Sequence, residues 1–146
     1  MSRGHDETPA WGLVFFRDER GAVPARDFLD TCPVAVAAKM LAVLDAVRRA
    51  PPPAFSGGGM WEAMSGSMGG YHEIRVQGPG RRHYRLFCLL ENGDPDHLAS
   101  CGFAGPRIVL IDGGVKANAT LFKDSHYRQV RRKGDAYRAT KPRPIA

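Results

Sequence analysis

Cysteine is scarce in this chain of 146 residues, and the three that occur lie far apart. They are Cys32, Cys88 and Cys101, an odd number without any Cys-x-x-Cys pair. This spacing excludes a disulfide framework and the usual structural zinc motif. His97 stands four residues before Cys101, but no second pair of ligands follows in that stretch. We therefore expect buried or idle thiols and no bound metal.

Long apolar runs are also missing. No stretch approaches the roughly 18 apolar residues that span a bilayer, and residues 1–10 lack the apolar core of a secretory signal. We therefore expect a soluble, cytoplasmic protein. Neither an internal repeat nor a low-complexity tract occurs, and the length is typical of one domain. We expect a single domain at 12–139, between a loose N-terminus at 1–11 and a basic tail at 140–146.

The net charge is +6, but most of the chain carries no excess of positive charge. Residues 1–115 hold 12 Lys and Arg against 13 Asp and Glu, a net charge of −1. Residues 116–146 hold 9 Lys and Arg against 2 Asp and Glu, a net charge of +7. Such a concentration favours a polyanionic partner, RNA or DNA first. A solvated helix with solubilising lysines and arginines has the same composition.

Short runs rich in β-branched and aromatic residues predict four strands. They cover residues 12–16, 71–76, 82–90 and 108–111. The sequence Gln77-Gly78-Pro79-Gly80 predicts a reversal that joins the second and third runs into a hairpin. We expect a short turn at 61–64 and a polar loop at 92–106.

Helices are predicted before and after these strands. Pro24 and Pro33 can each open one, because a proline at the first helical position loses no hydrogen bond. The second helix carries a predicted buried stripe of Ala37, Met40, Leu41, Leu44 and Val47. Ser125 or Asp124 can cap a basic helix, and we expect Gly134 to fray or bend it. The predicted fold is α+β: a small, mainly antiparallel sheet with two N-terminal helices on one face and a basic C-terminal helix.

Alternation along the predicted hairpin gathers charged side chains on one face. Because successive strand residues point to opposite faces, Glu73 lies beside Arg75, and His83 lies beside Arg85. Lys116 follows the last strand and is expected near the same surface. These five residues are the candidate catalytic group.

Metal-independent RNA cleavage requires cations to stabilise extra negative charge and groups that move two protons. Arginine forks bind phosphate oxygens, and Glu73, His83 or a lysine among like charges can carry protons. Further basic residues are candidate RNA contacts: Arg81, Arg82, Lys123, His126, Arg128, Arg131 and Arg132. Taken alone, strand arginines are more often surface charges or ion-pair partners.

Four segments, in this order, resemble one protein family. They are Gly21-x-x-Pro24-Ala25-x-Asp27-Phe28-Leu29, Tyr71-His72-Glu73-Ile74-Arg75, Tyr84-Arg85-Leu86-Phe87, and residues 108–116 with the basic helix after them. This pattern is similar to the HigB-like branch of the RelE superfamily, which includes the phage-derived Gp49-like proteins, and it covers about residues 12–139.

The resemblance implies a toxin of a type II toxin–antitoxin system. Such a toxin is an mRNA endoribonuclease that commonly acts on the ribosome without a metal or small-molecule cofactor. Its implied partner is a HigA-like helix-turn-helix antitoxin. Arg85 matches the family's phosphate-stabilising arginine, Arg75 a basic position on the preceding strand, and Lys116 the next cation.

The chain departs from the family pattern after its last strand. Val115 replaces an aromatic residue, and Ala117-Asn118 replaces a second lysine. No tyrosine directly follows Lys116, so Phe122 or Tyr127 would have to serve. Two other functions fit the sequence. One is a non-catalytic RNA- or ribosome-binding module on the same fold, and the other is a structural or regulatory subunit with a basic surface helix.

Overall fold

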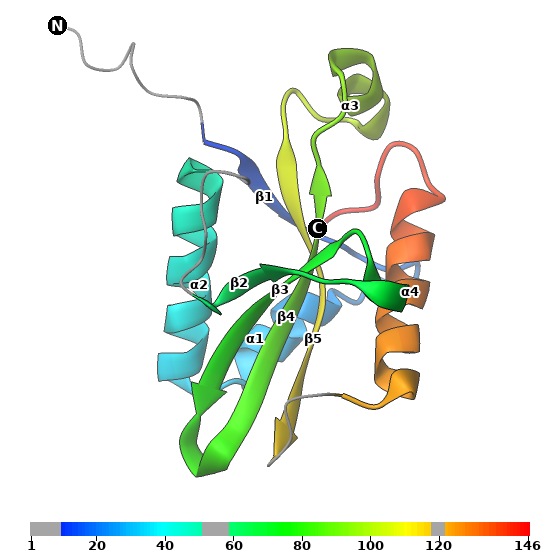
Figure 1. The fold of residues 1–146 in the computed structure, drawn as a ribbon. Helices are drawn as coiled ribbons and strands as arrows, with labels where there is room; N and C mark the ends of the chain where they lie inside the picture. The colour runs from blue at the N-terminus through cyan, green and yellow to red at the C-terminus, as the bar shows by residue number, and fades with distance from the viewer. Residues whose placement is uncertain (1–9, 51–58, 118–121) are drawn as a thin grey trace, which may run out of the picture.

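A five-stranded sheet organises the chain (Figure 1). The computed structural model describes residues 10–50, 59–117 and 122–146. Its strands are β1 (Gly12–Phe15), β2 (Trp61–Ala63), β3 (Tyr71–Gly78), β4 (Arg82–Glu91) and β5 (Arg107–Ala117). They lie in the order β1-β5-β4-β3-β2, with β1 parallel to β5 and the other neighbours antiparallel. The α+β class with a mainly antiparallel sheet is therefore confirmed.

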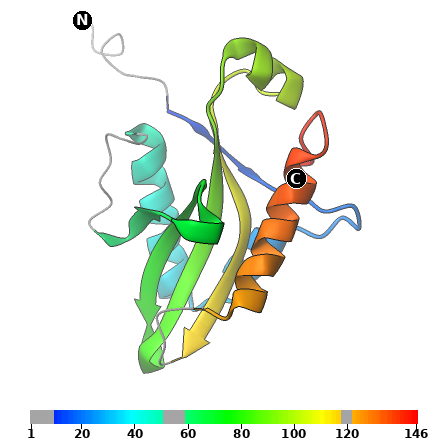
Figure 2. The ribbon, with the colours of Figure 1, turned by 45° about the vertical axis from the view of Figure 1, so that its right-hand side comes forward.

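Helices pack on both faces of this sheet. The described residues form α1 (Pro24–Thr31), α2 (Val34–Arg49), α3 (Pro95–Cys101) and α4 (Asp124–Arg138), with 3-10 turns at Gly66–Met68 and Pro79–Arg81. Helices α1 and α2 bury one face, and the prediction that they share it is confirmed. Helix α4 packs on the opposite face through Val130 and Tyr137. Figure 2 shows the sheet between α2 and α4. Within the described ranges, no helix is long and apolar enough to cross a membrane.

Four local predictions are wrong. Neither Asp124 nor Ser125 caps α4, because the helix already begins at Asp124 and its N-cap residue is Lys123. The segment 92–106 is not all loop, because Asp94 caps α3 by accepting the His97 N–H at 2.8 Å. Residues 61–64 do not form a turn but contain β2, which pairs with β3 at the sheet edge. Leu41 is 49% exposed, because the buried stripe of α2 passes through Val43 instead.

The last seven residues pack on the protein rather than form a loose tail. Ile145 pairs with Phe16 just after β1, and the Ala146 N–H donates to the Phe15 carbonyl at 2.9 Å. Arg143 is buried, and its Nε donates to Glu91 Oε2 at 2.8 Å. A basic tail is therefore the wrong description of residues 140–146. Residues 1–9 of the expected loose N-terminus lie outside the described residues.

Gly134 lies where α4 packs most closely on the sheet. Helix α4 continues through Gly134 to Arg138, so the helix does not fray at this glycine. A methyl group at this position would overlap the hydroxyl oxygen of Tyr71 on β3. That hydroxyl is buried and has no hydrogen-bond partner among the described residues. Glycine therefore permits the close approach of helix and strand.

We expect Gly134→Ala to lower the free energy of unfolding by about 2 kcal/mol, because overpacking outweighs the roughly 1 kcal/mol gained in helix propensity. Tyr71→Phe removes the overlapping oxygen, so Tyr71→Phe/Gly134→Ala should recover part of this loss. Urea unfolding of the wild type, both single variants and the double variant measures these changes. A Gly134→Ala protein as stable as the wild type would contradict the close contact.

Candidate active site and nucleic-acid interface

The five candidate catalytic residues lie on one face of the sheet, the face on which α4 packs. Arg75 is directly opposite Arg85 in the register of β3 and β4. His83 is directly opposite Lys116 in the register of β4 and β5. Glu73 precedes Arg75 by two residues and so shares its face. The geometry thus brings together the residues that sequence alternation grouped.

Lys116 reaches this face only because β5 contains a β-bulge. Phe87 pairs with Asp112 while Cys88 pairs with Leu110, so Ile111 is the extra residue of β5. The bulge reverses the alternation that starts at residue 108, and Asp112 then faces α4. Without it, Lys116 would share the α1 and α2 face with Leu110.

Four charged side chains form two diagonal ion pairs at the centre of the site. Across the strands, Glu62 of β2 faces Glu73, and Arg75 faces Arg85. Arg75 Nη1 lies 2.8 Å from Glu62 Oε1, and Arg85 Nε lies 3.5 Å from Glu73 Oε1. Opposite charges thus meet along the diagonals and offset the repulsion between like charges directly across the strands. We call these four residues the charge quartet; its formal net charge is zero.

The two ion pairs differ in burial. Arg85 is 3% exposed, whereas the side chain of Arg75 is 35% exposed. Burial raises the pKa of Glu73, although Arg85 and Arg75 oppose this rise. Burial likewise lowers the pKa of Arg85, with Glu73 opposing. Both shifts disfavour the charged forms, so the Glu73–Arg85 pair does not fully offset the desolvation of its members. Buried, perturbed charges of this kind are enriched at functional sites.

Aromatic rings border the site where α4 begins. The ring of His126 lies 4.6 Å from that of Phe122 and 5.9 Å from that of Phe87, measured between centroids. Gly114, opposite Arg85, makes room for them, since a Cβ there would approach both Phe122 and His126 within 2.7 Å. Burial lowers the pKa of His126, Asp112 opposes this, and Lys133 adds to it. His126 Nε2 is buried without a partner among the described residues. Nε2 faces the sheet at Gly114, so this nitrogen is not placed to contact a phosphate.

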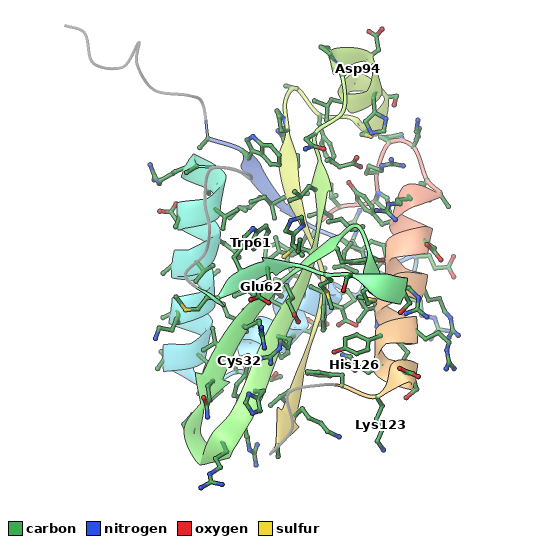
Figure 3. All side chains as sticks on the ribbon, in the orientation of Figure 1. Cys32, Trp61, Glu62, Asp94, Lys123 and His126 are labelled. Carbon is green, nitrogen blue, oxygen red and sulfur yellow. The ribbon has the colours of Figure 1, made fainter. Side chains whose placement is uncertain are left out.

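The basic residues expected to bind RNA come from two parts of the fold, and not all of them are exposed. Five of them are exposed: Arg81, Arg82, Lys123, Arg128 and Arg132. Arg81 and Arg82 lie at the tip of the β3–β4 hairpin. The other three lie just before α4 or along it. Arg131 is partly buried and donates to Ser67 Oγ at 3.2 Å, so it joins α4 to the turn after β2. Figure 3 shows Lys123 and His126 at the start of α4, away from Glu62 on β2.

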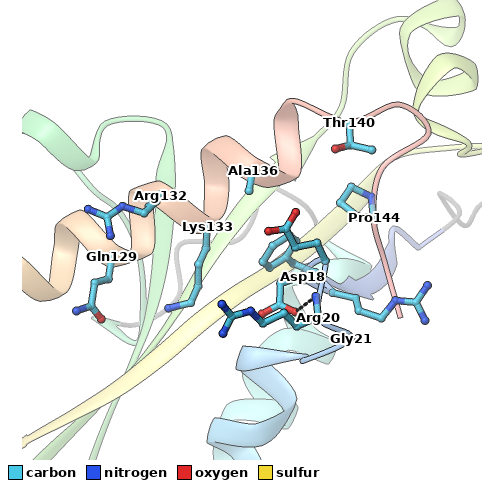
Figure 4. A pocket seen from close by; sticks show the side chains of 12 residues that line it. Asp18, Arg20, Gly21, Gln129, Arg132, Lys133, Ala136, Thr140 and Pro144 are labelled. Atoms are coloured by element: carbon cyan, nitrogen blue, oxygen red, sulfur yellow. Dashed lines mark hydrogen bonds between the residues drawn. The ribbon is translucent and has the colours of Figure 1, made fainter.

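Two hollows lie next to α4. The smaller, of about 230 Å³, is lined by Lys116, Lys123 and His126 among others. The larger, of about 960 Å³, lies between α4 and the turn at 17–21, with Arg132 on its wall (Figure 4). The larger hollow contains none of the five candidate catalytic residues, so volume does not identify the site.

Sequence reasoning missed two residues that shape the site. Glu62 lies in a segment for which the sequence predicts a turn, although Trp61-Glu62-Ala63 alternates apolar and polar residues as a strand does. Asp112 was missed as a structural partner; its Oδ2 accepts from Lys133 Nζ at 2.7 Å and ties β5 to α4.

Comparison of this chain with protein-family models, with curated proteins and with solved structures finds no match. The resemblance to RelE and HigB toxins therefore stays a prediction. Support for a function comes from the site's own residues and from that resemblance.

Proposed function

We propose that this protein is a RelE/HigB-like toxin, a metal-independent endoribonuclease that cleaves mRNA on the translating ribosome. The proposed inhibitor is a helix-turn-helix antitoxin that covers the charge quartet. One observation carries the proposal: Glu73, Arg75 and Arg85 from a hairpin share one sheet face with His83 and Lys116. Acid, base and cations for phosphodiester cleavage are all present in this set.

In the proposed reaction, the ribose 2′-oxygen attacks the adjacent phosphorus and the 5′-oxygen leaves. Glu73 takes the proton from the 2′-hydroxyl, and its raised pKa makes it a stronger base than an ordinary carboxylate. Arg75 binds the scissile phosphate. Its ion pair with Glu62 is half-exposed, and exposed pairs contribute at most about 1 kcal/mol, so a phosphate can compete for the guanidinium.

The remaining candidates have supporting roles in this proposal. Lys116 adds a second cation, and His83 across from it protonates the leaving 5′-oxygen. Arg85 is too deeply buried to meet a phosphate while it holds Glu73, so we assign it the positioning of that carboxylate. This differs from the direct phosphate contact that the family resemblance implies for Arg85.

A second candidate function is a non-catalytic RNA- or ribosome-binding module. The zero formal charge of the quartet and the burial of Arg85 favour it. In that case the exposed arginines of the hairpin tip and α4 bind phosphates without chemistry. Binding would then weaken steeply with salt, because phosphate contacts release counterions.

One assay separates these functions. Purified protein is incubated with end-labelled mRNA, free and on translating ribosomes, in the presence of a chelator, and binding and strand breaks are measured together. The proposal expects strand breaks on ribosome-bound mRNA. Salt-sensitive binding to RNA that stays intact would support the second candidate. Neither binding nor cleavage by folded protein would favour a structural or regulatory subunit.

A further inference from the structure

A second cluster of chemically active side chains lies at the end of β4 remote from the hairpin tip. Glu91 ends β4, and His97 and Cys101 lie four residues apart on α3. Because Glu91 follows Arg85 by six strand residues, the two positions are about 20 Å apart. Figure 1 shows α3 at the end of the sheet opposite the hairpin tip. This cluster is therefore separate from the charge quartet.

The two distances from His97 Nε2 match those between ligands of one tetrahedral ion, and one ligand atom from each of the three residues lies within 4.8 Å of the other two. His97 Nε2 lies 3.1 Å from Glu91 Oε1, and Cys101 Sγ lies 3.6 Å from His97 Nε2 and 3.7 Å from Glu91 Oε2. Bonds of about 2.0 Å to nitrogen and oxygen and about 2.3 Å to sulfur place tetrahedral zinc ligands roughly 3.2 to 3.6 Å apart. A nitrogen, an oxygen and a sulfur ligand together suit Zn²⁺.

The carboxylate is held in place from behind, as metal-binding carboxylates usually are. Glu91 Oε2 accepts hydrogen bonds from Tyr137 Oη and from Arg143 Nε, both at 2.8 Å. These donors come from α4 and from the C-terminal segment, so two separate parts of the chain hold Glu91. Oε1 is left directed at His97.

We propose that Glu91 Oε1, His97 Nε2 and Cys101 Sγ bind one Zn²⁺ ion. The thiol of Cys101 gives its proton to solvent when the ion binds, because thiolate is the metal-binding form. Cys101 is 1% exposed and Glu91 8%, whereas the side chain of His97 is 36% exposed. The fourth position therefore opens on the His97 side and is taken by water. The ion would tie α3 to the end of β4 and to the segment that holds Arg143.

This site differs from the expectation of idle thiols and no metal. From the sequence, His97 and Cys101 lie four residues apart in a predicted loop, with no second pair of ligands nearby. The third ligand comes from β4, and the fold rather than local spacing brings it to the other two.

The test uses the full chain, purified under reducing conditions and freed of metal, then titrated with Zn²⁺ and Co²⁺. We expect one equivalent of Co²⁺ to produce a thiolate-to-cobalt charge-transfer band. Added Zn²⁺ should displace the Co²⁺ and abolish this band. Zn²⁺ should also raise Tm, since it binds the folded state. Both effects should be lost in His97→Gln and Cys101→Ser and kept in Cys32→Ser, the control for a thiol elsewhere. Tyr137→Phe should weaken Zn²⁺ binding about 10-fold.

His97 lies on the exposed side of a short helix, so His97→Gln is the variant expected to keep the fold, which circular dichroism checks. Loss of the band in folded His97→Gln supports the site. The proposal is overturned if the wild type gives no charge-transfer band at stoichiometric Co²⁺. It is equally overturned if the band persists in both His97→Gln and Cys101→Ser, because the thiolate would then come from another cysteine.

Discussion

Arg85→Met is expected to lower RNA cleavage about 100-fold at neutral pH, the size of effect typical of a lost proton-transfer contribution. Arg85 is nearly inaccessible and lies against Glu73, the proposed base. Without Arg85, the carboxylate loses the neighbour that orients it. The loss should appear mainly in kcat, since Arg75 and Lys116 still bind the RNA.

The pH dependence of this variant distinguishes positioning from phosphate binding. Burial raises the pKa of Glu73, and the charge of Arg85 is the larger of the two influences that hold this rise in check. Removal of Arg85 therefore raises the pKa further, and the acidic limb of the pH–rate profile should move to higher pH. If Arg85 contacted the phosphate alone, the rate would fall without such a shift.

Two further variants complete this test. Arg85→Lys keeps a positive charge near Glu73 and should retain more activity than Arg85→Met. Arg26→Ala changes an exposed arginine of α1, on the opposite face of the sheet, and should leave cleavage unchanged. Full activity in a folded Arg85→Met protein would remove Arg85 from the mechanism.

The second large effect concerns stability. Glu73→Leu is expected to lower the free energy of unfolding by about 3 kcal/mol, because it leaves the buried guanidinium of Arg85 without its carboxylate. The double variant Glu73→Leu/Arg85→Met should regain most of this loss or exceed the wild type. Replacing both members of a buried ion pair with apolar residues is often neutral or stabilising. The pKa shifts of both partners, each toward the neutral form, predict the same outcome.

A double-mutant cycle by urea unfolding at neutral pH measures this coupling. The wild type, both single variants and the double variant are compared, and Arg75→Ala supplies the control for the half-exposed pair. That control should change stability by less than about 1 kcal/mol. Additive effects at Glu73 and Arg85 would show that the two side chains do not interact, and the positioning role of Arg85 would then be wrong.

The hairpin of β3 and β4, which carries three of the four residues of the charge quartet, could be predicted from the sequence. Its signals are local: alternation along each strand and a reversal at Gly78-Pro79. Arg75 and Arg85 could be grouped from their positions in two neighbouring runs. Lys116 lies on the expected face only because the bulge at Ile111 turns it toward α4, and alternation from residue 108 does not predict that bulge.

Other parts of the site depend on contacts between distant segments and could not be read from local patterns. The ion pair of Arg75 needs Glu62, which lies 13 residues earlier on an edge strand of three residues. The Glu91 cluster joins the end of β4 to helix α3, whereas the composition of residues 92–106 predicts a loop. Helix α4 can pack on its face of the sheet because Gly134 leaves room for Tyr71. From composition alone, a glycine at this position predicts only a weakened helix.

If the sheet face that carries the charge quartet cleaves RNA by attack of a 2′-hydroxyl, each cut leaves a 2′,3′-cyclic phosphate. The most direct measurement is mass spectrometry of the ends produced when ribosome-bound mRNA is treated with the wild type and with Glu73→Gln. We expect 2′,3′-cyclic phosphate ends with the wild type, and few with Glu73→Gln. Intact mRNA with folded wild-type protein, or equal cleavage by Glu73→Gln, would contradict this mechanism.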